Sequence, residues 1–322
     1  METEHDTSPT TTYHIDLDVS DVQPSDASSP GHFSCLFDPV KKTSGLLMLL
    51  FDSDGNSTLK EMSRQHVLRM TQEAARSVSS MCPGSKIPAE TASVCDLQPV
   101  HARDIRRMEN VFSSFNEPSV VIRQQAIFFS ADPLRAIVLR DACLVYVPDG
   151  ADSLLSMLKH YFVMNARDDT SPYEFRALET LLATLARYFR AQYDQLSPIV
   201  IVDLERLVHG HLDSRELERL REFKNTMNEF ETQVDGVRRV LMELLDNEED
   251  LRLLYLTKLF ETPSLLANFY SFDSEEAEVL IEYYLQEIFS TRTTAELLQR
   301  RITNTESLVT LKLDLKHYHL HE

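Results

Sequence analysis

The sequence predicts an α+β protein: a small α/β unit followed by a bundle of long helices that ends in an extended stalk helix. Three observations predict it. Short strand-like apolar runs lie between residues 44 and 150, and apolar residues recur at helical spacing from Asp152 onward. After Pro263, neither glycine nor proline interrupts the chain. We therefore expect segments 1–43, 44–150, 151–273 and 274–322.

Residues 1–43 are expected to form a disordered acidic tail, because serine, threonine, aspartate and proline dominate them. The first 30 residues contain seven acids and no lysine or arginine. A mitochondrial transit peptide or a secretory signal has a different composition, so we expect a cytosol-facing start. The four cysteines show no C-x-x-C spacing, which indicates a reducing compartment without a disulfide or zinc framework.

The segment 44–150 is predicted to form the α/β subdomain. We expect strands at 46–51, 120–122 and 126–129, a hairpin of 137–139 with 143–147, and an amphipathic helix at 59–78. Residues 52–58 resemble the opening of a calcium-binding loop, but Ser57 and Ser63 occupy the positions that need glycine and glutamate. A turn from strand to helix is the favoured interpretation.

The helical subdomain at 151–273 leads into the predicted stalk helix at 274–322. At 1.5 Å per residue this helix would be about 70 Å long. Apolar or small residues recur along it at alternating steps of three and four, which is typical of a helix packed against other helices. The two threonines in this seam, and Lys312 near its end, suit a bundle or a partly wet central shaft better than a dedicated dimeric zipper. The seam residues are Ile281, Tyr284, Ile288, Thr291, Ala295, Leu298, Ile302, Thr305 and Val309.

Composition limits the function. No apolar run reaches the roughly 18 residues of a membrane helix, so we expect no transmembrane helix and a soluble chain. A formal charge of -19 argues against nucleic acid and anionic membrane surfaces as partners, and it favours divalent cations. No nucleophile signature or glycine-rich phosphate loop is present, and seven glycines are few for a nucleotide enzyme. We therefore expect a protein that is not an enzyme.

One acidic run stands out because four carboxylates, Asp246, Glu248, Glu249 and Asp250, fall within five residues at an expected helix break. Two carboxylates about 4 Å apart repel by roughly 1 kcal/mol in water and more in a protein, so they need a counter-charge. Arg252 or a bound cation can supply it. The residues alone favour a solvated acidic surface.

Four motifs together resemble the eukaryotic branch of the CorA magnesium transporters, the mitochondrial RNA-splicing type. In order they are residues 101–106 (HARDIR), 121–127 (VIRQQAI) with 134–137 (LRAI), 172–179 (PYEFRALE), and 244–250 (LLDNEED) with 255–257 (YLT). The end of the family's long stalk resembles Ile302, Thr305 and Glu306 with Leu313 and Asp314. The likeness covers about residues 44–322, the soluble N-terminal domain of such a transporter.

The resemblance implies a homopentamer in a complete relative, with Mg2+ both transported along the central axis and bound between soluble domains as a feedback signal. It implies interfacial acids for divalent ions at Asp132, Glu229 and Asp314, and acids of the helix-break loop at Asp246, Glu248 and Glu249.

Some positions depart from the family pattern. The Gly-Met-Asn filter motif and both membrane helices are absent from this chain, so a membrane association would run only through missing C-terminal helices. Gln233 and Leu297 stand where relatives carry acids, and Tyr318 stands in place of an asparagine.

Two hypotheses follow. The first is a soluble, magnesium-sensing regulatory domain of a CorA-type transporter, truncated before the membrane and facing the cytosol. The alternative is a pore-less paralogue that acts as a helical interaction or adaptor protein.

Overall fold

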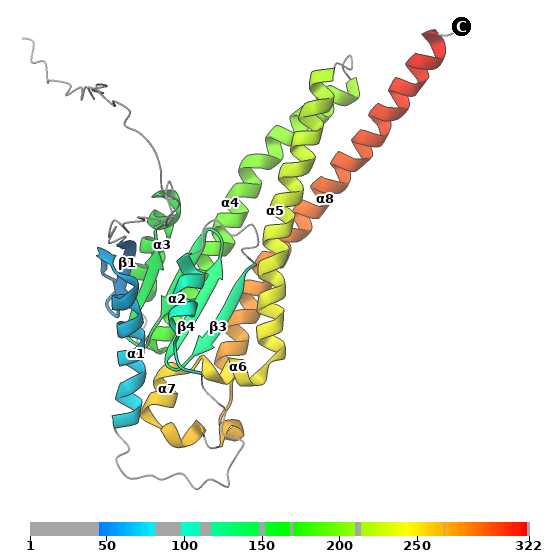
Figure 1. Ribbon diagram of the computed structural model, residues 1–322. Coiled ribbons are helices and arrows are strands. Elements are labelled where there is room, and N and C mark those ends of the chain that lie inside the picture. The colour runs from blue at the N-terminus through cyan, green and yellow to red at the C-terminus, as the bar shows by residue number, and fades with distance from the viewer. Residues whose placement is uncertain are drawn as a thin grey trace, which may run out of the picture. The chain divides into compact units, whose positions relative to one another are not determined.

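The computed structural model describes residues 45–80, 98–109, 117–147, 152–167, 170–209, 214–266 and 268–320 (Figure 1). The expectation for the acidic tail at 1–43 lies outside these residues. Residues 43–322 form one compact unit. The predicted boundaries at 150 and 273 within this unit stay predictions.

The predicted α+β class is confirmed, with a six-stranded antiparallel sheet at its centre. The strand order is β2-β1-β6-β5-β4-β3. The strands are β1 (Leu46–Asp52), β2 (Ser57–Met62), β3 (Ser119–Arg123), β4 (Ala126–Ala131), β5 (Leu134–Val138) and β6 (Ala142–Tyr146). The hairpin expected from residues 137–139 and 143–147 is the β5–β6 pair, in which Val138 pairs with Cys143.

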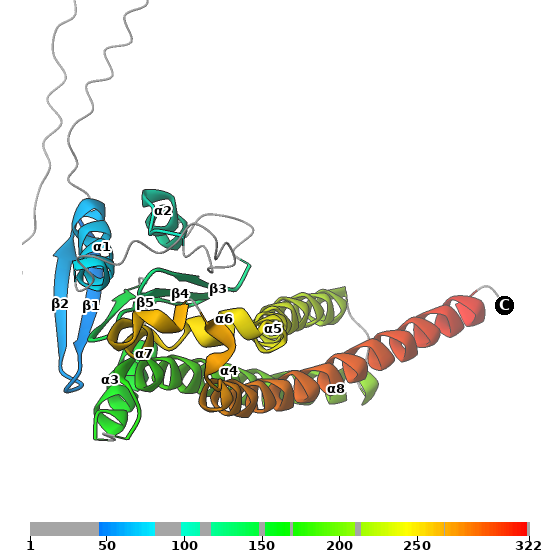
Figure 2. The same ribbon diagram turned by 90° about the horizontal axis from the view of Figure 1, so that it is seen from below.

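Both faces of the sheet are covered, which explains why its inner strands are apolar at nearly every position. Phe129 on β4 belongs to a core cluster shared with α3 (Asp152–Asn165) and α4 (Tyr173–His209). Its neighbour Phe128 points the other way, into a smaller cluster shared with α1 (Arg64–Ser80) and α2 (Ala102–Glu109). Figure 2 shows α1 and α2 on one side of the sheet and the long helices on the other.

The expected helix at 59–78 is wrong in its first part. Residues 57–62 form β2, in which Leu59 pairs with Leu49 of β1. The helix begins only after Ser63, whose hydroxyl accepts a hydrogen bond of 3.2 Å from the backbone N–H of His66, as an N-cap does. Pairing with β1 supplies β2 with backbone hydrogen bonds, and this tertiary contact overrides the helical spacing of the apolar residues. The short helix α2 was not expected.

Residues 53–56 form the turn that joins β1 to β2, so the turn from strand to helix expected at 52–58 is also wrong. Gly55 in this turn has a φ of +80°. A Cβ atom at Gly55 would lie 2.7 Å from the Cβ atom of Ala166 and 2.9 Å from the carbonyl oxygen of Phe162. Both the backbone conformation and the space therefore require glycine.

Replacing Gly55 by alanine is expected to lower the free energy of unfolding by about 1–3 kcal/mol, because a strained backbone and a steric clash are introduced together. Urea denaturation followed by circular dichroism measures this change. The exposed neighbour Ser53 provides the control, since its replacement by alanine should stay within about 0.5 kcal/mol. Equal stability of the Gly55→Ala variant and the wild type would contradict the assignment.

Helices and short connections make up the rest of the described chain, as expected from residue 152 onward. After α4 come α5 (Ser214–Asp246), α6 (Glu248–Leu253), α7 (Leu256–Glu261), two short 3-10 turns at Pro263–Leu266 and Phe269–Ser271, and α8 (Glu275–Leu320). The predicted stalk is thus one helix of 46 residues. Among the described residues, no helix combines the length and the apolar character needed to cross a membrane.

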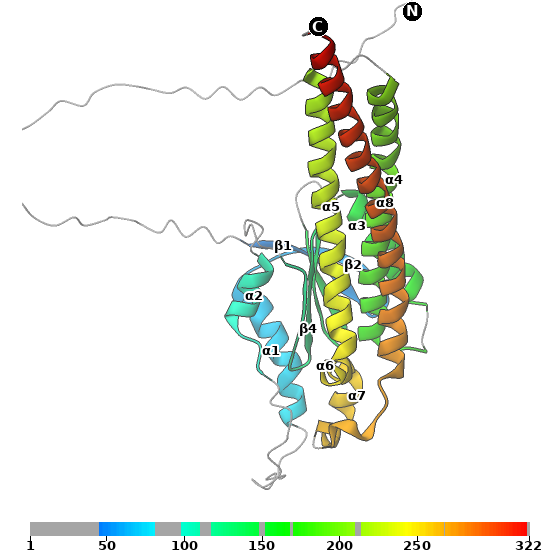
Figure 3. The ribbon, with the colours of Figure 1, turned by 90° about the vertical axis from the view of Figure 1, so that its right-hand side faces the viewer.

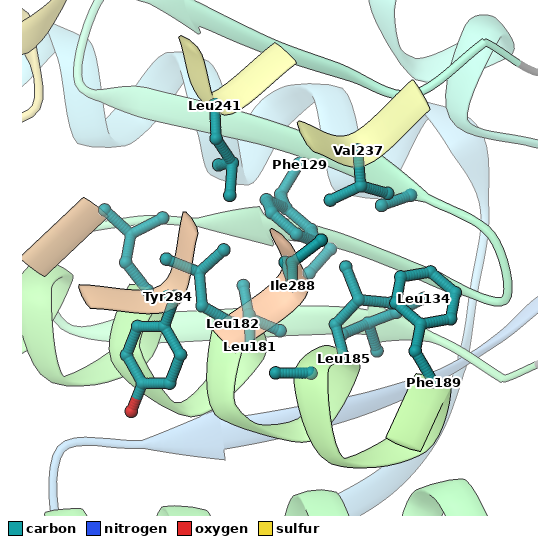
Figure 4. Packing of buried hydrophobic residues seen from close by; sticks show 14 of the residues in the cluster. Phe129, Leu134, Leu181, Leu182, Leu185, Phe189, Val237, Leu241, Tyr284 and Ile288 are labelled. Atoms are coloured by element: carbon teal, nitrogen blue, oxygen red, sulfur yellow. The ribbon is translucent and has the colours of Figure 1, made fainter. Parts of the chain in front are cut away.

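The seam predicted along α8 is confirmed, because all nine of its residues are buried. They pack against α4 and α5 of the same chain, which run beside α8 (Figure 3). Figure 4 shows Ile288 of α8 among Leu182 of α4, Val237 of α5 and Phe129 of the sheet. Arg292 adds an ion pair to Asp235 of α5 at 3.2 Å.

A buried carboxylate joins two of the motifs. Glu174, in the first turn of α4, accepts hydrogen bonds from the backbone N–H of Thr257 at 2.7 Å and from its hydroxyl at 2.8 Å. Phe175 packs edge-on against Tyr255, with ring centroids 4.7 Å apart. The segments 172–179 and 255–257, separated by more than 70 residues in the sequence, therefore form one contact that fixes α7 to the start of α4.

Candidate functional site

A surface groove of about 950 Å³ lies between α4, α5 and the edge of the sheet. Two of the predicted site residues, Asp132 and Glu229, line it together, although 97 positions separate them in the sequence. Its apolar lining comes from Pro118, Leu196, Ile199 and Phe230. Its polar lining comes from Glu117, Asp132, Gln192, Gln195, Thr226, Asn228, Glu229, Thr232, Gln233 and Arg239.

Asp132 is positioned by the tight connection between β4 and β5, where Ala131 pairs with Leu134. Its carboxylate oxygen Oδ1 receives two contacts from Arg135, 2.8 Å from Nε and 2.7 Å from Nη2. The side-chain amide of Gln233 on α5 donates a 2.6 Å hydrogen bond to the backbone carbonyl of Asp132. The turn is therefore held both by the sheet and by α5.

Glu229 lies on α5, one helical turn before Gln233, and is exposed. The adjacent Phe230 is buried against Phe189 of α4, with ring centroids 6.3 Å apart. This packing fixes the rotation of α5 about its axis, so that Glu229 faces solvent at the groove. Among the described residues, Glu229 forms no ion pair.

The acidic run lies in a second, shallower depression of about 700 Å³, lined by Glu243, Asp246, Asn247, Glu248, Glu249 and Tyr270. Asn247 interrupts the helix, and its side-chain oxygen caps α6 by accepting hydrogen bonds from the N–H groups of Glu249 at 3.1 Å and Asp250 at 3.3 Å. The predicted helix break is thereby confirmed. Three predicted site residues, Asp246, Glu248 and Glu249, come together here.

One acid of this second depression, Glu248, has a counter-charge within its own chain. Arg252 forms an ion pair with Glu248 at 2.9 Å, so one of the two counter-charges considered from the sequence is present. Burial raises the pKa of Asp250, and the neighbouring charge of Glu249 raises it further. Asp246 and Glu249 remain exposed to solvent. A cation near them would relieve the repulsion between carboxylates.

Asp314 is exposed near the C-terminal end of α8 and lines neither depression. The structure therefore does not bring it together with the other predicted residues in a single chain. Within the described part of the chain, no three histidine, cysteine, aspartate or glutamate side chains are grouped so that they could hold a metal ion.

Sequence reasoning missed several residues of these sites. Glu117 and Glu243 contribute further carboxylates, but each is a single acid without a distinctive pattern. Arg135 was noted only as part of a motif. Arg135 follows Asp132 by three residues at the connection between β4 and β5. This spacing was the signal in the sequence that could have predicted the ion pair.

Known magnesium transporters match most of this chain. The family model for "Magnesium transporter MRS2-like" matches residues 85–317. "Magnesium transporter MRS2-7" of Arabidopsis thaliana is 27% identical over 264 residues, covering 67% of each chain.

Two further relatives come from mouse and yeast. "Magnesium transporter MRS2 homolog, mitochondrial" of Mus musculus is 31% identical over 147 residues, which cover 44% of this chain and 34% of the relative. "Mitochondrial inner membrane magnesium transporter LPE10" of Yarrowia lipolytica is 28% identical over 220 residues, or 66% of this chain and 47% of the relative. The resemblance inferred from the motifs is thereby confirmed. The chain belongs to the MRS2-like family of magnesium transporters, the eukaryotic branch of the CorA superfamily.

Proposed function

We propose that this chain is the magnesium-sensing, regulatory part of a magnesium transporter and that it acts in a homo-oligomer. The observation that carries the proposal is the placement of five predicted carboxylates in two surface depressions of a chain from a magnesium transporter family. Asp132 and Glu229 line the first depression, and Asp246, Glu248 and Glu249 line the second.

The chemistry of Mg2+ supports exposed carboxylates as its ligands. The ion keeps several of its water molecules and is usually bound by one or two carboxylates rather than by a closed protein cage. A protein with a net charge of -19 gains stability when a divalent ion reduces the repulsion between its acids. Sites of this kind are completed readily when a second chain brings another carboxylate close. We propose that Asp314 plays that part.

The outer face of α8 supports the assembly. Six large apolar residues on it are between 52% and 60% exposed, namely Val279, Tyr283, Leu297, Leu308, Leu311 and Leu315. At 3.6 residues per turn they fall within an arc of about 80°, away from the buried seam. Exposed polar residues, among them Gln286, Ser290 and Asn304, interrupt this stripe. Its apolar groups at 279–283 and 308–315 favour a protein contact.

We propose that the stripe on α8 contacts the groove face of a neighbouring copy. When each copy uses one surface to contact a different surface of the next copy, the copies form a closed ring if their successive rotations add up to a full turn. The number five comes from the resemblance to the CorA transporters, and the stripe supports a closed ring of any size. In such a ring Asp314 would approach the acids of the next subunit.

We further propose that the chain faces the cytosol. The pore would then be formed by membrane helices outside the chain described here. The names of the mouse and Yarrowia relatives place those proteins in mitochondria. Imaging a fluorescent fusion of the natural protein tests this point, and a mitochondrial signal would overturn it.

Magnesium is expected to promote self-association of the chain in sedimentation velocity experiments at constant ionic strength. The double variant Glu229→Gln/Asp314→Asn should lose most of this response, because it removes one carboxylate from each proposed side of the contact. The control Glu218→Gln/Glu261→Gln removes the same number of charges from exposed positions outside both depressions and should respond like the wild type.

The outcome separates the two hypotheses. Association that is identical with and without magnesium, in the wild type and in both variants, would overturn magnesium sensing and favour the pore-less adaptor. Equal loss of response in the test variant and the control would show that only net charge matters, and it would remove Glu229 and Asp314 from the site.

A further inference from the structure

A hydroxyl group at the surface joins the segment before α4 to the start of α8. Ser171 lies between α3, which ends at Asn165, and α4, which begins at Tyr173. Its hydroxyl donates a hydrogen bond of 2.9 Å to Oε1 of Glu276, in the first turn of α8. The two residues are 105 positions apart in the sequence, and the bond is exposed to solvent. A chemical change at this hydroxyl group therefore acts on the contact between two long helices.

Pro172 makes Ser171 accessible to a modifying enzyme. A residue before proline disfavours the helical conformation and takes an extended one. Protein kinases bind the residues around the accepting serine as an extended segment, and one class of them requires proline directly after that serine. Ser197 is also followed by proline, but it lies inside α4, a continuous helix from Tyr173 to His209. In the folded chain, such a kinase can reach Ser171 more readily than Ser197.

A phosphate group on Ser171 would be repelled by α8. Glu275, Glu276 and Glu278 all lie in the first turn of this helix. Phosphoserine carries a charge of about −1.5 to −2 at pH 7, and its ester oxygen has no proton to donate. The hydrogen bond to Glu276 would be lost, and repulsion between like charges at short distance would replace it.

The start of α4, in contrast, would attract the phosphate group. Nη1 of Arg176 donates a hydrogen bond of 3.2 Å to the carbonyl oxygen of Ala166, so its guanidinium group reaches back beyond the start of α4. Within the described part of the chain, Nε of Arg176 is buried without a hydrogen-bond partner, and the guanidinium group forms no ion pair. Arginine binds phosphate well, and the N-terminus of a helix adds a partial positive charge.

We propose that Ser171 is a phosphorylation site for a protein kinase that recognises serine before proline, and that the phosphate moves residues 170–172 from α8 to the start of α4. Oγ of Ser171 attacks the γ-phosphorus of ATP, the bond between that phosphorus and the leaving oxygen of ADP breaks, and the hydroxyl proton passes to a base of the kinase. The modified residue then exchanges Glu276 for Arg176 as its partner. The inference goes beyond the proposed function and does not depend on magnesium binding by this chain.

The first test is phosphorylation of the full chain with ATP and a mitogen-activated protein kinase, which requires proline after the accepting residue. Mass spectrometry of peptides locates the phosphate and follows its rate of incorporation. Ser171 should be modified at least about tenfold faster than Ser197, which becomes accessible only when α4 opens. Equal rates at these two serines would overturn the proposal. So would modification of Ser8, Ser29 or Thr262, which also precede proline, without modification of Ser171.

Hydrogen exchange measures the effect on α8. Phosphorylation should speed the exchange of the backbone amides in residues 275–279 about fivefold, because repulsion replaces the hydrogen bond from Ser171. Glu276→Gln should remove most of this effect, since it removes the repelling charge. Glu275→Gln is the matched control. It removes an equal charge from the same turn, but Ser171 contacts Glu276, so the effect of the phosphate should persist.

Phosphorus NMR measures the new contact at the start of α4. A nearby guanidinium group stabilises the doubly charged phosphate, so the second pKa of the phosphate at position 171 should lie below its ordinary value. A phosphate that stays beside Glu276 would instead have a raised pKa. Arg176→Gln should reverse most of the downward shift. The signal from position 171 is identified by its absence in Ser171→Ala.

Three further results would overturn the inference. The first is phosphate on Ser171 with unchanged exchange at residues 275–279, because α8 is then unaffected. The second is a second pKa of the phosphate that is not lowered, which the wild type reveals even if Arg176→Gln fails to fold. The third is an equal loss of the effect in Glu276→Gln and Glu275→Gln, which would show that only the net charge of the turn matters.

Discussion

Replacing Ile288 by alanine is expected to lower the free energy of unfolding by about 2–4 kcal/mol. Ile288 is fully buried at the place where α8 meets α4, α5 and the sheet. Removing its methyl and methylene groups loses their burial and leaves a cavity that the surrounding helices fill only in part. Urea denaturation of the wild type and of the Ile288→Ala variant measures the change. The slope of free energy against urea concentration is taken as the same for the two proteins.

Leu297 on the same helix gives the matched comparison. It is 59% exposed and belongs to the outer stripe of α8, so Leu297→Ser should change the free energy of unfolding of the single chain by no more than about 0.5 kcal/mol. Self-association in sedimentation velocity should instead weaken. If Leu297→Ser destabilises the chain as strongly as Ile288→Ala, the two faces of α8 are wrongly assigned.

Replacing Glu174 by alanine is the second change with a large expected effect, about 2–4 kcal/mol of unfolding free energy. The substitution removes both acceptors of Thr257 and leaves a backbone N–H near α7 without its partner. It also removes the negative charge that interacts with Arg140. Thermal and urea denaturation measure the loss. Thr257→Val should cost less, because the backbone N–H of residue 257 keeps its carboxylate acceptor.

Glu174→Gln tests the charge separately from the hydrogen bonds. Burial raises the pKa of Glu174 above its ordinary value, and the hydrogen bonds from Thr257 and the charge of Arg140 offset this only in part. Because the folded state binds the proton more tightly than the unfolded state, ionisation of Glu174 opposes folding. Its contribution to stability therefore falls as the pH rises from the unfolded pKa of about 4.3 to the raised folded value.

Glutamine keeps an oxygen for Thr257 and has no proton to lose in this range. Glu174→Gln should therefore stay within about 1 kcal/mol of the wild type at neutral pH, and it should show a flatter decline of stability above about pH 4.3. Stability curves for the two proteins that run parallel from acid to neutral pH would contradict the role given to this carboxyl group.

Periodicity predicted the helical half of the fold well. The seam of α8 could be identified because a three-four spacing repeated over many turns has few alternative explanations. The break before α6 could be predicted because acids and asparagine favour the start of a helix. Strand β2 could not, because the spacing of Leu59 and Met62 also fits a helix, and only pairing with β1 decided between them.

The residues of the candidate site also fall into those that the sequence could place together and those that only the fold brings together. Asp246, Glu248 and Glu249 are neighbours in sequence, so their proximity needed no tertiary information. The resemblance to a family selected Asp132 and Glu229, but only the packing of α5 beside the sheet puts both at one groove. The ion pair that distinguishes Asp132 from Glu229 depends on the turn between β4 and β5 and on the end of α2.

The sequence by itself determined the α+β class, the long terminal helix and its buried face, and the motifs that lead to the MRS2-like family. These features depend on local spacing or on short runs of residues, which a chain carries before it folds. Only the tertiary structure decided which carboxylates share a surface and which of them is already neutralised. The reason is physical: the free energy of a charge depends on its neighbours in space, and those neighbours come from distant parts of the sequence.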